Sequence, residues 1–376
     1  MAALAKQNKS GPDGQAASKA YFALEYTLDH LIATYPKPYI AYMDGITMGG
    51  GVGLSAHAPF RIATERTVFA MPETTIGFFP DVGASFFLPR MDGSVGTYLG
   101  LTSERLQGVN AFYAGVATHY IHSSSLPTLT ERLSELAFKD YDPLAARLKV
   151  IDATIEEFGT GLPHDVPMLM AGELRKAVDR CFQFDTMEKI IKALEGEKKG
   201  AMPEWAEKTL KTLSERSPTS LKVALKEMRL GNDWGIGDAF RREYHIAEKF
   251  MERPDFVAGV SARLINKPPT IPKWNPATLE HVSDKDVNNI FTVAGAQMLK
   301  LAAEGNYPEY PFGKTIGLPR ERDVEMMVRD TPASKEDLVK KVVAARNGKV
   351  GVREKVEEML ERMCTENGEG QLVWGL

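Results

Sequence analysis

The feature that most constrains the fold is a glycine-rich loop directly after a short apolar stretch. Tyr39–Met43 predicts a strand, and the loop at 44–55 reads Asp-Gly-Ile-Thr-Met-Gly-Gly-Gly-Val-Gly-Leu-Ser. Three consecutive glycines, Gly49 to Gly51, let a ligand approach the backbone because no Cβ stands in the way. A helix that begins there would direct free amide N–H groups at a phosphate or an oxyanion.

This loop has other interpretations. A Walker P-loop is excluded because no Gly-Lys-Ser/Thr follows. A dinucleotide-binding fingerprint fits Gly51 to Ala56 as G-x-G-x-x-A with Glu73 about twenty residues further on, although Met71-Pro72 breaks the strand that should carry the acid. The glycines could also serve tight strand-to-helix packing without any ligand.

The pattern around the loop indicates an α/β fold. Apolar residues at helical spacing predict a helix over 18–34, and strand-like stretches follow at Phe60–Thr64 and Thr67–Ala70. Beyond about residue 102 helical patterns dominate. They cover 126–138, 173–194, 205–213, 220–230 and 240–252, with one strand candidate at 115–121. A proline-rich stretch at 267–276 predicts a linker or an extended crossing segment.

These patterns divide the chain into four predicted parts. We expect a loose lead-in at 1–16, an α/β core at 17–125, a helical remainder at 126–290 and a helical C-terminal extension at 291–376. The extension contains a Pro/Tyr/Gly-rich interlude at 307–319 and charged helices from Ser334 onward.

Composition excludes several classes of function. The 46 basic and 50 acidic residues give a net charge of −4, which supplies no field that would gather DNA. Two cysteines, Cys181 and Cys364, without Cys or His at metal-ligand spacing argue against a disulfide scaffold and a zinc site. No window reaches the roughly 18 apolar residues that span a bilayer. We therefore expect no metal, no membrane and no DNA partner.

Two carboxylates, Glu73 and Asp81, stand in a loop at 71–83 that is otherwise mainly apolar. Burying a carboxyl without a partner costs free energy, so the presence of these acids in an apolar loop requires an explanation. One explanation is acid–base or nucleophilic catalysis on a substrate bound nearby. The alternatives are that Glu73 pairs with Arg61 or Arg66, and that Asp81 caps a helix beginning at Val82.

The glycine loop, the Pro-Glu-Thr at 72–74 and the Phe-Pro-Asp-Val-Gly at 79–83 together resemble the crotonase (enoyl-CoA hydratase/isomerase) superfamily, most closely its 3-hydroxyisobutyryl-CoA hydrolase branch. The resemblance covers about the first three quarters of the chain. It implies a spiral of ββα units and hydrolysis of 3-hydroxyisobutyryl-CoA in valine breakdown, in the mitochondrion and without a cofactor. Hydration or isomerisation of an enoyl-CoA is an alternative activity. A place in the mitochondrial small ribosomal subunit is another alternative.

The resemblance assigns roles to four residues. Gly50 is the oxyanion-hole donor, Glu73 attacks the acyl carbon or activates water, and Asp81 orients the substrate or exchanges the proton. Glu25, on the preceding helix, occupies the position of an additional substrate-contacting acid. The partners expected are an acyl-CoA and other copies of the chain. Lys222, Lys226 and Arg229 share a helical face that could meet CoA phosphates, or could simply be solvated.

The superfamily begins with further strands and a loop that donates a second oxyanion N–H, and the sequence here begins about where that loop should end. We therefore expect an N-terminally truncated fold. With one donor of two absent, the rate should be roughly a hundred- to a thousandfold lower.

Overall fold

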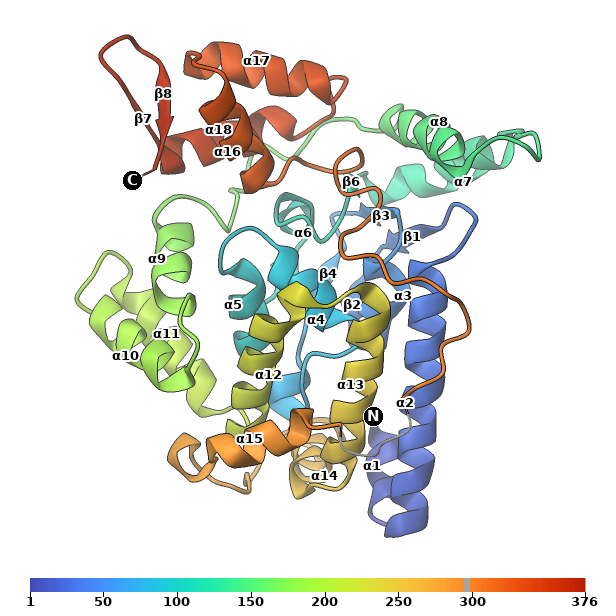
Figure 1. Cartoon of the computed structure of the whole chain (residues 1–376), viewed down its shortest axis with the longest axis vertical. Coiled ribbons are helices and arrows are strands. Elements are labelled where there is room, and N and C mark those ends of the chain that lie inside the picture. Colours follow the sequence, from blue (N-terminus) through green and yellow to red (C-terminus); the bar gives the residue numbers. More distant parts are fainter. Residues whose placement is uncertain (294–297, 376) are drawn as a thin grey trace.

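The computed structural model of the chain describes residues 1–293 and 298–375. Two small sheets lie at its centre (Figure 1). In the first, β3 (Phe60–Ala63) lies between β1 (Ile40–Met43) and β6 (His119–Tyr120), parallel to both. In the second, β4 (Val68–Ala70) pairs in parallel with β2 (Ile46–Met48) and antiparallel with β5 (Leu106–Gln107). The first four strands alternate between the sheets, so the chain winds as a spiral of strand pairs and the predicted α/β class is confirmed.

The strand predictions hold where β-branched and aromatic residues cluster, at β1, β3 and β4. The expected strand at 115–121 is wrong for most of its length, because Gly115 has a φ of 80° and only His119–Tyr120 pairs with β3. The expected helix at 173–194 is also wrong as one element. Thr186 interrupts it and accepts a hydrogen bond from the Lys189 N–H, which is the N-cap geometry of a new helix.

The lead-in at 1–16 is not loose. Residues Ala2–Asn8 form α1, and α2 (Pro12–Ala33) begins at Pro12, a residue preorganised for the first helical position. Leu4 is buried, and the Asn8 side chain donates to the Met251 carbonyl at 2.8 Å. Packing on the body of the protein therefore overrides the weak helical preference of this short segment.

Helices surround the sheets and form the rest of the domain (Figure 1). Within the core these are α3 (Gly50–Ala56), the short 3₁₀ turn η1 (Glu73–Ile76), α4 (Ala84–Phe87), α5 (Val95–Thr102) and α6 (Val109–Tyr113). The remainder comprises α7 (Leu126–Ser134), α8 (Leu144–Glu156), α9 (Gly172–Phe182), α10 (Met187–Glu197), α11 (Pro203–Ser214), α12 (Pro218–Leu230), α13 (Ile236–Met251), α14 (Pro254–Val260) and α15 (Asp284–Phe291). The stretch at 267–276 has neither helix nor strand, and the Trp274 indole donates to the Glu215 carbonyl at 3.1 Å, which fits the extended crossing segment.

The C-terminal extension packs on the domain instead of standing apart. It contains α16 (Glu321–Asp330), α17 (Lys335–Ala345), α18 (Val352–Met363) and the hairpin β7 (Cys364–Glu366) and β8 (Leu372–Trp374). Residues 298–320, which we call the strap, run beside α2 towards these helices (Figure 1). The Tyr307 hydroxyl donates to the Ala33 carbonyl at 3.0 Å, and Leu318 and Val324 belong to the same hydrophobic core as the central sheets.

No helix in the described ranges combines the length and apolarity that crossing a bilayer requires.

Candidate active site

The glycine turn joins β2 to α3. Gly49 has a φ of 52° and α3 begins at Gly50, so the first amide N–H groups of the helix have no carbonyl partner within it. A Cβ built on Gly50 would lie 2.7 Å from Glu25 Oε1, whereas one on Gly51 would meet no atom within 4 Å. A side chain at position 50 would therefore displace the Glu25 carboxylate from the turn. The turn can present a backbone N–H to an oxyanion.

Glu73 and Asp81 are brought to the same region of the fold. Glu73 opens η1, is 4% exposed, and lies so that its Oε1 would be 3.6 Å from a Cβ built on Gly49. Asp81 is 3% exposed and accepts a hydrogen bond from the Tyr26 hydroxyl at 2.7 Å. The Oε2 atom of Glu73 is buried and has no hydrogen-bond partner among the described residues. These are the surroundings expected of carboxyls that act on a bound substrate.

The two alternative roles for these acids are wrong. Arg66 pairs with Asp44, and Arg61 donates to backbone carbonyls, so neither arginine neutralises Glu73. The helix after Asp81 begins at Ala84 with Gly83 at its N-cap, and the Asp81 carboxylate accepts from Tyr26.

Burial and mutual repulsion control the protonation of this pair. Burial, together with the charges of Glu25 and Glu243, raises the pKa of Glu73 from 4.5 to about 8. Burial also raises the pKa of Asp81 well above its usual range, and the negative charges of Glu73 and Glu25 add to that effect. Because two buried like charges that repel each other resist ionising together, the pair holds at least one proton at neutral pH.

Glu25 lies on α2 beside the glycine turn. Its Oε1 accepts from the Tyr21 hydroxyl at 3.3 Å, and its Oε2 is buried with no hydrogen-bond partner among the described residues. Burial raises the pKa of Glu25 as well. The structure thus brings together the four residues Glu25, Gly50, Glu73 and Asp81 that the resemblance assigned to the site; their catalytic roles stay predictions.

Three further acids near Glu73 and Asp81 were not predicted from the sequence. Asp29 lies one helical turn after Glu25, where burial and the charges of Glu25 and Glu243 raise its pKa to about 9. Glu243, on α13, accepts from the N–H groups of Gly83 at 2.7 Å and Ser85 at 3.0 Å, which holds the chain immediately after Asp81. The spacing of Asp29 after Glu25, on one helix face, could have indicated the first of these.

The third missed acid, Glu227, is fully buried on α12, and neither carboxylate oxygen has a hydrogen-bond partner among the described residues. Burial, with the charges of Glu243 and Asp81, raises its pKa well above the usual range. Glu227 therefore adds another proton-holding group to the buried acids around the pair.

The basic face predicted on α12 is already engaged within the protein. Lys222 contacts Glu188 at 2.7 Å, and the Arg229 Nε donates to Asp185 at 3.0 Å. Lys226 donates to the side chain of Asn288. Side chains held by their own neighbours favour a structural role over the binding of CoA phosphates.

One group of side chains outside this region could hold a cation. Donor atoms of His119, Asp152 and Glu156 lie within 4.8 Å of one another. The His119 Nε2 is 3.0 Å from Asp152 Oδ1 and 3.1 Å from Glu156 Oε1, and the Lys349 ammonium contacts the same Glu156 oxygen. A lysine against the carboxylate favours a network of ion pairs, so the expectation of no metal stays a prediction.

Comparison with known proteins identifies the class. The family model described as enoyl-CoA hydratase/isomerase matches residues 1–291. A carnitinyl-CoA dehydratase from Mycobacterium thermoresistibile superposes with a TM-score of 0.67 at 33% identity over 80% of each chain. An enoyl-CoA hydratase from Rhodobacter sphaeroides gives 0.65 at 31% identity, over 79% of this chain and 80% of its own. The chain belongs to the enoyl-CoA hydratase/isomerase family, whose crotonase-fold enzymes process CoA thioesters.

Two groups of relatives have a higher sequence identity to the chain than these two structures do. The chain is 52% identical to small ribosomal subunit protein mS47 of Neurospora crassa over 100% of this chain and 75% of that protein. It is 41% identical to the mitochondrial 3-hydroxyisobutyryl-CoA hydrolase of Gallus gallus over 78% of this chain and 73% of that protein. The predicted mitochondrial location is confirmed at the level of these relatives.

Proposed function

We propose that the chain hydrolyses a CoA thioester, 3-hydroxyisobutyryl-CoA, to 3-hydroxyisobutyrate and CoA in mitochondria. One observation carries this proposal: the buried Glu73 carboxyl lies beside the Gly49–Gly50 turn, and its charge acts on a second buried carboxyl, Asp81. Acyl transfer needs a donor for the oxyanion, a group that delivers oxygen to the carbonyl carbon and an acid for the leaving thiolate. The turn and the two carboxyls can supply these functions, and the mitochondrial hydrolases at about 40% identity support the substrate.

In this proposal the thioester oxygen accepts a hydrogen bond from the Gly50 N–H. Deprotonated Glu73 attacks the acyl carbon, or removes a proton from a water that attacks it, and the carbon–sulfur bond breaks. The raised pKa of Asp81 keeps a proton available, which passes to the departing thiolate. Where Glu73 attacks directly, water then hydrolyses the acyl–Glu73 anhydride. On either route the proton taken from water returns to Asp81, so one water is added across the thioester and the acid and the free thiol are released.

The test follows thiol release from 3-hydroxyisobutyryl-CoA with the full chain. Glu73→Gln should lower the rate by at least about a hundredfold, since the variant can neither attack nor accept a proton. Glu131→Gln, an exposed glutamate on α7, is the matched control and should leave the rate unchanged. Equal turnover by wild type and Glu73→Gln would contradict the proposal. Faster hydration of crotonyl-CoA than hydrolysis would instead favour a hydratase.

The extension favours a second candidate function, membership of the mitochondrial small ribosomal subunit. The match to the Neurospora crassa mS47 spans the entire chain, whereas the match to the Gallus gallus hydrolase spans 78% of it. We infer that the extension is shared with ribosomal relatives because it contacts the particle. In this proposal the extension contacts the particle and the carboxyls of the core act on the thioester, so one protein can carry both functions.

This second candidate is tested by sedimentation of the full chain with small mitochondrial subunits through a sucrose gradient. Charge reversal at the exposed Lys340 and Lys341 of α17 should reduce co-sedimentation. The same change at Lys208 on α11, 72% exposed, is the control and should have no effect. Wild-type protein that stays at the top of the gradient would rule this role out.

A further inference from the structure

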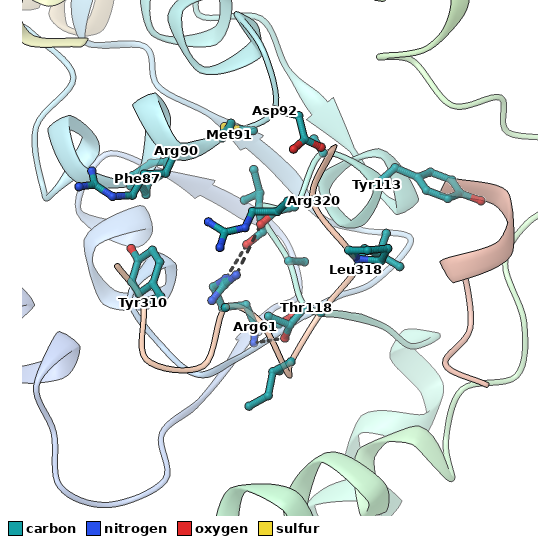
Figure 2. A pocket seen from close by; sticks show the side chains of 18 of the residues that line it. Arg61, Phe87, Arg90, Met91, Asp92, Tyr113, Thr118, Tyr310, Leu318 and Arg320 are labelled. Atoms are coloured by element: carbon teal, nitrogen blue, oxygen red, sulfur yellow. Dashed lines mark hydrogen bonds between the residues drawn. The ribbon is translucent and has the colours of Figure 1, made fainter. Parts of the chain in front are cut away.

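A cavity lies between the core and the strap, away from the candidate active site. It has a volume of about 110 Å³, and its lining includes the last residue of α6, the loop 114–118 that leads to β6, and the strap (Figure 2). Ala56, the last residue of α3, also lines it, whereas Gly50 begins the same helix. Six residues of α-helix span about 9 Å, so the glycine turn and this cavity lie at opposite ends of α3.

Positive charge dominates the lining of this cavity. Arg61, Arg90, Arg320 and Lys355 line it, and Asp92 is the acidic side chain among its lining residues. Among the lining side chains, four cations and one carboxylate leave an excess of three positive charges. Two carboxylates outside the lining, Glu309 and Asp323, lie within 4.0 Å of Arg320, but Arg322 and Arg346 share them. Charges of one sign that surround a small, partly enclosed space repel one another strongly, because little water screens them. An anion in the cavity would relieve that repulsion.

Arg90 and Lys355 contribute mainly charge. Arg90 donates to a set of backbone carbonyls that includes Phe86 at 2.7 Å and Trp234 at 2.9 Å. The Lys355 side chain is 5% exposed, and its ammonium lies 3.4 Å from Asp92 Oδ2. The other oxygen of Asp92 already accepts from the Glu321 N–H at 2.9 Å. One carboxylate thus serves a buried ammonium and a helix N-terminus together.

Arg61 is the best-placed donor on the core side. Its Nε donates to the Val116 carbonyl at 2.6 Å and its Nη1 to the Ala58 carbonyl at 2.7 Å. Its Nη2 makes only a long contact of 3.5 Å to Gly115, so the five N–H groups of the guanidinium are not all used. No carboxylate of the described residues comes within 4 Å of Arg61. Its charge is therefore unpaired.

Arg320 faces Arg61 from the strap. Figure 2 shows both guanidinium groups directed into the space between the core and the strap. The Nη1 of Arg320 donates to Glu309 at 3.2 Å, and its Nε is buried with no hydrogen-bond partner among the described residues. Glu309 is shared, because Arg322 also donates to it at 3.0 Å. Arg320 thus has donors free on the cavity side.

We propose that this cavity binds a phosphate dianion, held by Arg61 and Arg320 and further stabilised by the charge of Lys355. Guanidinium groups match the oxygens of phosphate in geometry, and a dianion fits the excess of positive charge better than a single carboxylate does. The small volume favours a free phosphate or the terminal group of a phosphomonoester over a polyanionic chain. The bound ion would also join the strap to the core.

The experiment titrates inorganic phosphate into the full chain by calorimetry, at a total ionic strength held constant with sodium chloride. Wild-type protein should bind one phosphate per chain and show a higher Tm in phosphate than in chloride. Arg320→Gln should weaken binding at least about tenfold. Arg322→Gln removes a neighbouring arginine that shares Glu309 but does not line the cavity, so its affinity should match that of wild type.

Two results would overturn the proposal. One is no heat and no Tm difference for wild type between phosphate and chloride. The other is an equal loss of affinity in Arg320→Gln and Arg322→Gln, which would show that only the general surface charge matters. A parallel titration with phenyl phosphate distinguishes the sources: tighter binding than inorganic phosphate assigns a phosphomonoester, and weaker binding assigns the free ion. Circular dichroism of each variant verifies that the fold is retained.

Discussion

The buried acids make the stability of the fold depend on pH in an unusual direction. In the unfolded chain Glu73 has its ordinary pKa of 4.5, and in the folded protein burial raises that pKa to about 8. Between these values the folded state holds a proton that the unfolded state has lost. The free energy of unfolding contributed by Glu73 is therefore largest in acid and falls as the pH rises towards about 8.

The size of this effect follows from the two pKa values. For a single group that shifts from 4.5 to about 8, the proton linkage between pH 5 and pH 8 amounts to ~3 kcal/mol of lost stability. Glu73→Gln keeps the shape of the side chain but cannot ionise, so it removes this dependence. At pH 8 the variant should be more stable than wild type by up to about that amount, and at pH 5 the difference should be small.

Urea unfolding at the two pH values measures this directly, with Glu131→Gln as the control for an exposed carboxyl. The control should follow wild type at both pH values. If Glu73→Gln loses as much stability as wild type between pH 5 and pH 8, then Glu73 is already ionised in the folded protein at neutral pH. The assignment of a proton to this carboxyl would then be wrong.

Two further substitutions test the site and the packing of the extension. Gly50→Ala should lower the rate of hydrolysis to within about a hundredfold of the background rate, because the new Cβ would lie 2.7 Å from Glu25 Oε1. Gly51→Ala should retain activity in the same thiol-release assay, because its new Cβ would meet no atom within 4 Å. Arg175→Met removes a buried cation from Asp179 and Glu321, of which Glu321 keeps Arg362, and should cost about 3 kcal/mol in urea unfolding. Arg329→Ala, which breaks an exposed pair, should cost less than about 1 kcal/mol.

The sequence predicted the elements whose formation depends on local pattern. β1, β3 and β4 combine β-branched or aromatic residues with flanking turn residues, and α11, α12 and α13 show clear helical spacing. The errors came where a distant contact or a single residue decides the conformation. Residues 2–8 are helical because Asn8 and Leu4 pack on the domain, and the break between α9 and α10 depends on one N-cap threonine.

The candidate site was predicted only in part, for a similar reason. Glu73 and Asp81 stood out because they are charged residues in an apolar loop, and the resemblance added Glu25 and Gly50. Glu243 lies 162 residues after Asp81 in sequence, yet its carboxylate holds the backbone of Ser85, and no local pattern reveals such a contact. A buried acid on a distant helix becomes recognisable only when the fold places it.

The strap has a consequence for how the molecule unfolds. Leu318 and Val324 belong to the same apolar core as Phe112 and the central sheets. The extension therefore has no separate core that would keep it folded on its own. Loss of the strap would expose apolar surface on both sides at once. We therefore expect a single cooperative melting transition for the full chain, and a protease should find no stable fragment that ends near residue 300. The C-terminal helices should therefore unfold in the same transition as the part of the domain that contains the buried carboxyls.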